Sequence, residues 1–158
     1  MVDGDTIKAR ALGGRRRRYA VRLIGIDTPE PHRPGTPIEC GGKQASASML
    51  RLSFTAPKDT DGDGLFDEKG GKGRRVKLVT DPTQETRDRY HRLLAYPHVG
   101  GCSQLNRTQV ARGWAKVYVY RHKRFRQYRS FRRAQRSAKL AGRGVWGMCG
   151  GHFHTPAR

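Results

Sequence analysis

The chain has 158 residues, a length that suits one domain and leaves no room for two ordinary ones. Its 33 Lys and Arg residues outnumber the 13 Asp and Glu residues, so the formal net charge is +20. No stretch is apolar for long enough to cross a bilayer, and we expect no transmembrane span. Three cysteines are too few for a disulfide-rich scaffold.

The charge is distributed unevenly along the chain. All the acidic residues lie between Asp3 and Asp88, whereas residues 89–158 carry sixteen Lys or Arg and no acid. Such a charge attracts polyanions, and nucleic acid is the leading partner because basic side chains neutralise its phosphates. An anionic membrane surface is the alternative, but the sequence has no basic helix with a strong apolar face. The few acids are therefore candidates for binding a metal in an enzyme that acts on a polyanion.

The first half of the chain predicts three strands, one helix and a long loop. Residues 6–12 and 19–26 alternate in polarity and predict two strands. Apolar residues at helical spacing predict a helix over 44–54. The Gly- and Asp-rich stretch 56–72 is expected to be a loop insertion, and 74–80 alternates again as a strand.

The second half predicts one strand, two helices and a tail. Residues 93–99 predict a strand, and Pro97 indicates that this strand either lies at the edge of the sheet or ends at Pro97. Residues 105–113 predict a short helix and 125–141 a long Arg-rich one, while 150–158 are expected to be a disordered tail. This order is typical of an α+β domain built around a small antiparallel sheet or barrel.

Three segments combine acidic and basic residues beside predicted turns. They are VDGDT at 2–6, VRLIGIDTPE at 21–30 and RDRYHRLLAY at 87–96. Each has an ordinary structural interpretation: a turn before a strand, an exposed arginine followed by a turn, and a solvated basic hairpin. Together they supply the parts for cutting a phosphodiester. Carboxylates and a carbonyl can hold a hard cation, arginines can clamp a phosphate, and a further carboxylate can orient or deprotonate water.

These segments, with LNRTQVARGWAKVYVY at 105–120 and AQRSAKLAGRGVW at 134–146, resemble the staphylococcal nuclease family in order and over nearly the whole chain. The resemblance implies an OB-type five-stranded antiparallel barrel with about three helices, spanning residues 1–149. The family's first strand precedes the DGDT motif. Here only Met1 and Val2 do so, and that strand is expected to be missing or truncated.

The resemblance also implies a function: calcium-dependent, sugar-nonspecific hydrolysis of DNA and RNA to 3′-phosphate products. By this resemblance, Asp5, Asp27 and the backbone carbonyl of Thr28 bind Ca²⁺, and Arg22 and Arg92 bind the scissile phosphate. Glu30 acts on the attacking water. The neighbouring phosphate and base are contacted by Arg89, Tyr90 and Tyr118. It favours a secreted monomer, although we expect no leader before the first motif. The alternative is a non-catalytic, basic nucleic-acid-binding module on the same fold.

A second calcium site is possible in the insertion. Asp59, Asp61, Asp63 and Asp67 spell DxDxDGxxD, in which alternating acids surround one cation and glycine allows a sharp turn. The alternative is a solvated acidic loop, because the bidentate Glu of an EF-hand is replaced by Gly70. If the loop binds calcium, we expect a structural role. A calcium-ordered adhesion module is a third functional reading, against which the basic surface argues.

Two further features leave alternatives open. In an extracellular protein Cys40 could pair with Cys149, and free buried thiols are the other possibility. The arginines within 124–136 have no acid nearby, so we expect them to steer nucleic acid without reading bases. The HFH sequence at 152–154 is interpreted as part of the disordered tail and not as a zinc site.

Overall fold

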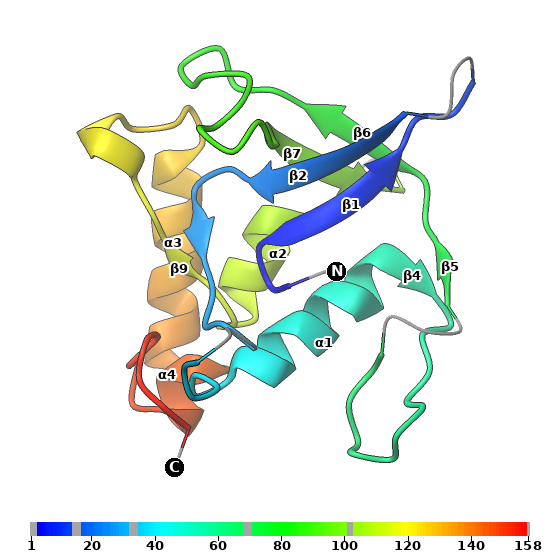
Figure 1. Ribbon diagram of the computed structural model, residues 1–158. Coiled ribbons are helices and arrows are strands. Elements are labelled where there is room, and N and C mark those ends of the chain that lie inside the picture. The colour runs from blue at the N-terminus through cyan, green and yellow to red at the C-terminus, as the bar shows by residue number, and fades with distance from the viewer. Residues whose placement is uncertain (1–2, 14–16, 32–34, 68–70, 101–102, 158) are drawn as a thin grey trace.

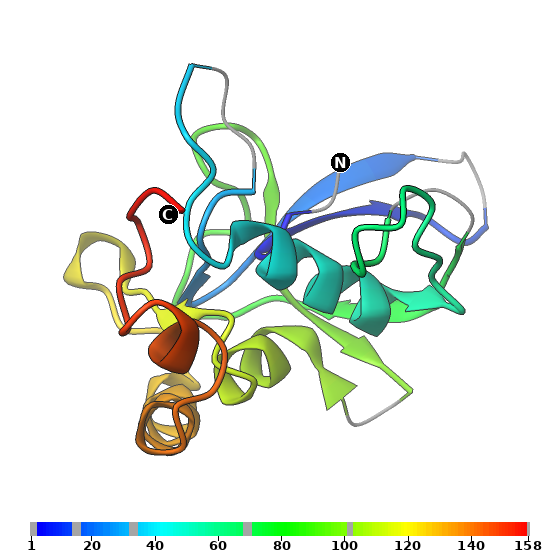
Figure 2. The same ribbon diagram turned by 90° about the horizontal axis from the view of Figure 1, so that it is seen from below.

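A computed structural model describes residues 3–13, 17–31, 35–67, 71–100 and 103–157. A curled sheet packs against helices, which confirms the α+β class expected from the sequence and agrees with an OB-like fold (Figures 1 and 2). Among these residues no helix is both long and apolar enough to cross a membrane.

The main sheet has the strand order β1-β2-β7-β6, and the short strand β8 pairs with β7. Its strands are β1 (Thr6–Arg10), β2 (Arg18–Leu23), β6 (Val76–Val79), β7 (Leu93–Val99) and β8 (Ser103–Gln104). One pairing differs from the expected antiparallel sheet. Strands β2 and β7 run parallel, with Val21 opposite Leu93 and Leu23 opposite Ala95. The sheet is therefore mixed, because the chain between these strands crosses over instead of forming a hairpin.

Two pairs of short strands lie outside this sheet. Strand β3 (Ile26–Asp27) pairs with β9 (Lys116–Val117), and β4 (Phe54–Thr55) pairs with β5 (Lys72–Gly73). The predicted strand 19–26 is split before β3 by Gly25, whose φ of 79° falls in the left-handed region. A Cβ on Gly25 would lie 2.4 Å from the Phe125 ring, so glycine is also required for packing.

The helices are α1 (Gly42–Ser53), α2 (Leu105–Ala111), the 3-10 turn η1 (Tyr120–His122), α3 (Tyr128–Leu140) and α4 (Val145–Met148). Helix α2 contacts α1, α3 and β7, which places it at the centre of the fold (Figure 1). Its buried Gln109 accepts a hydrogen bond from Ser48 and donates to the carbonyls of Ala45 and Gly4, thereby holding the turn before β1.

The core lies between the curled sheet and the helices, and its members are Ile7, Val21, Leu23, Ile24, Ile26, Met49, Leu50, Ala95, Tyr96, Leu105, Val110, Ala115, Phe125, Phe131 and Ala134. Pro97 lies within β7 and not at its end. Pairing with β2 stops at Ala95, so the missing amide of Pro97 falls beyond that partner.

The C-terminal segment differs most from its expected disorder. The Phe153 ring is buried and lies 5.0 Å from the Trp146 ring, centroid to centroid, in an edge-to-face contact. Gly150 and Gly151 both have a positive φ and let the chain turn back towards the loop before α1. The burial of Phe153 therefore fixes a segment that was expected from its composition to be disordered, and the two glycines allow the turn that this packing requires.

The same segment is tied to the loop before α1. Cys40 and Cys149 form a disulfide, which confirms that pairing over free thiols; Cys102 lies outside the described residues. The Cys40 amide donates to the Thr155 carbonyl at 2.8 Å, and the Ala157 amide donates to the Ile38 carbonyl at 2.7 Å. Figure 2 shows the C-terminal end beside this loop.

Candidate active site

Asp5 lies in the turn just before β1 and is almost fully buried. Its Oδ2 atom accepts a hydrogen bond from the Thr28 amide at 3.2 Å and lies 3.0 Å from Nη2 of Arg22. Its Oδ1 atom accepts from the Thr6 hydroxyl at 3.1 Å. Gly4 allows this approach, because a Cβ there would lie 2.6 Å from the Thr28 side chain.

The electrostatic environment of Asp5 disfavours its charged form. Burial raises the pKa of Asp5 to about 7; Arg22 opposes this effect, and the neighbouring Asp3 and Asp27 add to it. A second cation beside Asp5 would therefore stabilise its carboxylate. The oxygen donors that meet here fit a hard divalent metal ion such as Ca²⁺.

The Arg22 side chain points towards both Asp5 and Asp27. In β2 its neighbours Val21 and Leu23 face the core, so the alternation of the strand turns Arg22 to the other face. Its Nη1 atom donates to the Ile26 carbonyl at 2.9 Å, while Nη2 lies 3.0 Å from Asp5 and 3.7 Å from Oδ1 of Asp27. Arg22 therefore brings the two predicted calcium-binding carboxylates together.

Asp27 ends β3 and uses its two oxygens differently. Oδ1 faces Arg22. Oδ2 lies 3.4 Å from Nζ of Lys116, which the β3–β9 pairing places directly opposite, and 2.8 Å from Nε2 of His154. The partner from the C-terminal segment was not expected from the sequence.

Glu30 lies three residues beyond Asp27, and its backbone is fixed on both sides by Glu39. The Glu30 amide donates to Oε2 of Glu39 at 2.7 Å, and the Glu39 amide donates to the Glu30 carbonyl at 3.1 Å. Gly42 packs on the same carbonyl, where a Cβ would come within 2.4 Å. The predicted water-activating residue therefore sits in a loop with a defined path.

His154 joins these two parts of the site. Its Nδ1 atom lies 2.9 Å from Oε2 of Glu39, and its Nε2 atom lies 2.8 Å from Oδ2 of Asp27. Burial alone would lower the pKa of His154, but the contacts with Glu39 and Asp27 outweigh it and raise the pKa above its ordinary value. The HFH sequence was the available signal for this residue, and the expectation of a disordered tail concealed it.

Arg92 approaches the site from the start of β7. Its Nε atom donates to Oδ2 of Asp88 at 2.7 Å, and Nη1 lies 3.5 Å from the Thr6 hydroxyl, which in turn contacts Asp5. Oδ1 of Asp88 accepts from the amides of Tyr90 and Arg92, both at 2.9 Å. Asp88 was assigned no role from the sequence, and the structure shows that it holds the Arg92 side chain.

Tyr90 and Arg89 form an exposed cluster beside Arg92. The guanidinium groups of Arg89 and Arg92 lie 4.7 Å and 5.3 Å from the centroid of the Tyr90 ring, and Tyr90 is 62% exposed. Tyr118 lies in a different segment. Its amide donates to the Gly25 carbonyl and its ring is exposed; among the described contacts none joins it to Arg89 or Tyr90.

The insertion brings together three of its four predicted ligands. Carboxylate oxygens of Asp59, Asp61 and Asp67 lie within 4.8 Å of one another. Asp63 instead pairs with Lys43 at 3.3 Å. Asp59 also accepts hydrogen bonds from the loop amides at 62 and 64, so it is partly engaged in shaping the turn.

Comparison with known proteins identifies the family of this chain. A family model described as staphylococcal nuclease homologue matches residues 20–148, most of the chain. The chain belongs to the staphylococcal nuclease family. The thermonuclease of Staphylococcus hyicus is 30% identical over 146 residues, covering 92% of this chain and 72% of that protein.

Two other relatives are similar over less of their own length. The thermonuclease of Staphylococcus intermedius is 34% identical over 120 residues, 76% of this chain and 57% of that protein. Endonuclease YncB of Bacillus subtilis is 32% identical over 152 residues, 94% of this chain and 60% of that protein.

Proposed function

We propose that this protein is a nuclease that hydrolyses phosphodiester bonds of DNA and RNA. The observation that carries the proposal is the convergence of Asp5 and Asp27 on Arg22, beside the loop that holds Glu30. The names of its relatives, thermonuclease and endonuclease, support the same reaction class. The net charge of +20 suits a polyanionic substrate.

Calcium is the proposed cofactor, held by Asp5, Asp27 and the backbone carbonyl of Thr28. The donor set is all oxygen and includes the buried Asp5 carboxylate, whose pKa is raised mainly by burial, and a bound cation would stabilise its charged form. When bound, the metal supplies Lewis-acid stabilisation of charge on the phosphoryl oxygens.

The chain's own residues supply the remaining chemistry. Glu30 orients the attacking water and accepts its proton. Arg22 and Arg92 bind the scissile phosphate and stabilise the negative charge that grows on its equatorial oxygens. Cleavage of the 5′ P–O bond then leaves a 3′-phosphate. The contact between Asp88 and Arg92 supports this role, because it directs the guanidinium towards the site.

The proposed substrate contacts do not distinguish DNA from RNA. Tyr90 and Tyr118 expose rings on which any base can stack, and Arg89 lies beside Tyr90 to meet a neighbouring phosphate. Exposed arginines of α3 extend the positive surface and steer the polyanion towards the site. We propose a monomer that functions outside the cell, where a disulfide such as Cys40–Cys149 persists.

We also propose that Asp59, Asp61 and Asp67 bind a second calcium ion with a structural role. Their proximity supports this role, and an ion would offset the mutual repulsion of the acids. Asp63 is not required, because it pairs with Lys43 instead.

The test of the nuclease proposal is Glu30→Gln, which keeps the size of the side chain and removes its basic oxygen. We expect turnover of single-stranded DNA to fall by about 10²–10⁴-fold. Binding should persist and weaken steeply with added salt, because phosphate contacts dominate. Equal turnover of variant and parent would contradict the role of Glu30. Salt-sensitive binding without any cleavage by the parent would favour the alternative, a non-catalytic binding module.

A further inference from the structure

The loop from Asp27 to Glu30 is connected at both ends to one imidazole ring. Nε2 of His154 contacts Oδ2 of Asp27 at 2.8 Å. Nδ1 of His154 contacts Oε2 of Glu39 at 2.9 Å, and that same oxygen accepts the Glu30 amide at 2.7 Å. The proposed metal ligand and the proposed water-activating residue are therefore linked through two side chains that no step of the reaction uses.

The contact with Asp27 leaves the other oxygen of that carboxylate facing the site. His154 and Lys116 occupy Oδ2, whereas Oδ1 faces Arg22 at 3.7 Å. A carboxylate held by one oxygen loses little further rotational freedom when its other oxygen binds a ligand, so such contacts make binding more favourable. The arrangement orients Asp27 without blocking it.

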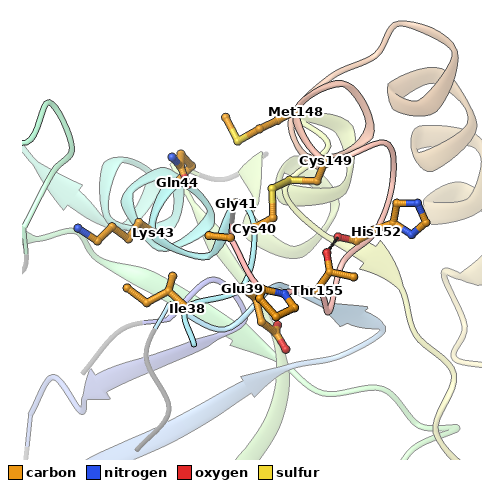
Figure 3. Close-up of a pocket in the computed structure, with 12 residues that line it drawn as sticks. Ile38, Glu39, Cys40, Gly41, Lys43, Gln44, Met148, Cys149, His152 and Thr155 are labelled. Atoms are coloured by element: carbon orange, nitrogen blue, oxygen red, sulfur yellow. Dashed lines mark hydrogen bonds between the residues drawn. A yellow bond between two sulfur atoms is a disulfide. The ribbon is translucent and has the colours of Figure 1, made fainter. Parts of the chain in front are cut away.

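Glu39 lies at the wall of a cavity. A cavity of about 1050 Å³ lies between the loop before α1 and the C-terminal segment (Figure 3). Glu39 and Thr155 both line this cavity. The Glu39 side chain is 18% exposed, and its carboxylate is held by polar contacts with His154 and with the Glu30 amide.

The ring of His154 is presented by a backbone that is already fixed. Phe153, its neighbour, is buried against Trp146. The disulfide at Cys149 and the hydrogen bond between Cys40 and Thr155 hold the segment before and after it. Little entropy remains to be lost when the imidazole makes its two contacts.

We propose that the C-terminal segment 150–157 is part of the active site, in which His154 and Glu39 are positioning residues that orient Asp27 and the backbone of Glu30. The inference rests on the proposed nuclease function. It assigns a role to a segment that the family model, which ends at residue 148, does not include.

Three substitutions of His154 separate its two contacts. Ala removes both. Gln places an amide nitrogen near the position of Nε2 and keeps the contact with Asp27, whereas Asn places one near Nδ1 and keeps the contact with Glu39. His152→Ala is the matched control, because His152 is an exposed histidine in the same segment. Calcium affinity is measured by calorimetry without substrate, and kcat and KM are measured on single-stranded DNA at saturating calcium.

We expect His154→Ala to lower kcat and calcium affinity by about 10–100-fold each, with KM for DNA changed little. Gln should restore calcium affinity more than Asn, and Asn should restore kcat more than Gln. The His152→Ala control should match the parent. If the Ala variant fails to fold, comparison of the Gln and Asn variants still tests the proposal, because Gln should have the higher calcium affinity and Asn the higher kcat.

Two results would overturn the inference. In one, His154→Ala matches the His152→Ala control in both kcat and calcium affinity; in the other, its activity rises, which would mean that the segment obstructs the site. Glu30→Gln is assayed in parallel. If the parent itself does not cut DNA, the nuclease proposal fails, and the calorimetry alone decides whether His154 orients Asp27; absence of calcium binding by the parent overturns both.

Discussion

Asp88 holds Arg92 through Nε, the nitrogen that joins the guanidinium to its side chain, at 2.7 Å. Burial alone would raise the pKa of Asp88, but hydrogen bonds and charge from Arg92 outweigh it and lower the pKa. The Asp88 carboxylate therefore stays ionised at neutral pH. With Nε engaged, the two terminal nitrogens of Arg92 can make a forked contact with a phosphate.

Arg92→Lys should be severe, because a lysine cannot make both the contact with Asp88 and a forked contact with phosphate. We expect kcat on single-stranded DNA to fall by about 10²–10³-fold, the loss typical of removing one transition-state donor. Asp88→Asn should cost less, because the guanidinium remains. Steady-state kinetics of the two variants check this order, and a Lys variant that retains parental kcat contradicts the role of Arg92.

The raised pKa of Asp5 predicts how stability depends on pH in the absence of metal. Because Asp5 binds its proton more tightly in the folded state than in the unfolded chain, the free energy of unfolding should fall as pH rises from about 4 to about 7. Asp5→Asn removes this effect. In a chelator, the variant should gain stability relative to the parent between about pH 5 and about pH 8.

Calcium provides the control for that measurement. At about pH 8 it should stabilise the parent by more than the Asp5→Asn variant, which keeps only the proposed site in the insertion, because a ligand stabilises only the form that binds it. Denaturant unfolding with and without calcium gives both comparisons. A stability difference that does not change with pH would show that Asp5 has an ordinary pKa.

The insertion can be tested by stoichiometry. The double variant Asp59→Asn/Asp61→Asn should bind one calcium ion fewer than the parent while its nuclease activity is retained. Asp63→Asn is the matched control and should keep the full stoichiometry, since Asp63 pairs with Lys43 outside the cluster. Equal stoichiometry of the double variant and the parent would make this a solvated acidic loop.

The disulfide closes a span of 109 residues and should stabilise the fold by restricting the unfolded chain. We expect Cys40→Ser/Cys149→Ser to lower the free energy of unfolding by about 2–4 kcal/mol. Denaturant unfolding under non-reducing conditions measures this difference. In a reducing agent, the stability of the parent should fall to that of the variant. Equal stability of parent and variant under non-reducing conditions would contradict the disulfide.

The sequence predicted the elements whose patterns are local. The alternation around Arg22 identified β2, helical spacing identified α1, and the long basic helix was expected about three residues before its observed start at Tyr128. That start is displaced because Phe125 leaves the helical path and packs on Gly25, a contact between residues far apart in the chain.

In the candidate site too, the residues in local motifs were predicted and those placed by long-range contacts were not. Asp5, Arg22 and Asp27 lie in recognisable motifs, and the structure brings them together. His154 lies 127 residues from Asp27 in a segment of glycines and polar residues without periodicity. Its position depends on the disulfide and on the burial of Phe153, and neither follows from local pattern.

The measurement that tests the central claim most directly is degradation of single-stranded DNA by the purified protein with calcium, with magnesium and with a calcium chelator. The account predicts cleavage to 3′-phosphate ends with calcium, none in the chelator, and loss of cleavage with calcium in the Glu30→Gln variant. Cleavage that persists in the chelator, or its absence with calcium while salt-sensitive binding remains, would contradict a calcium-dependent nuclease.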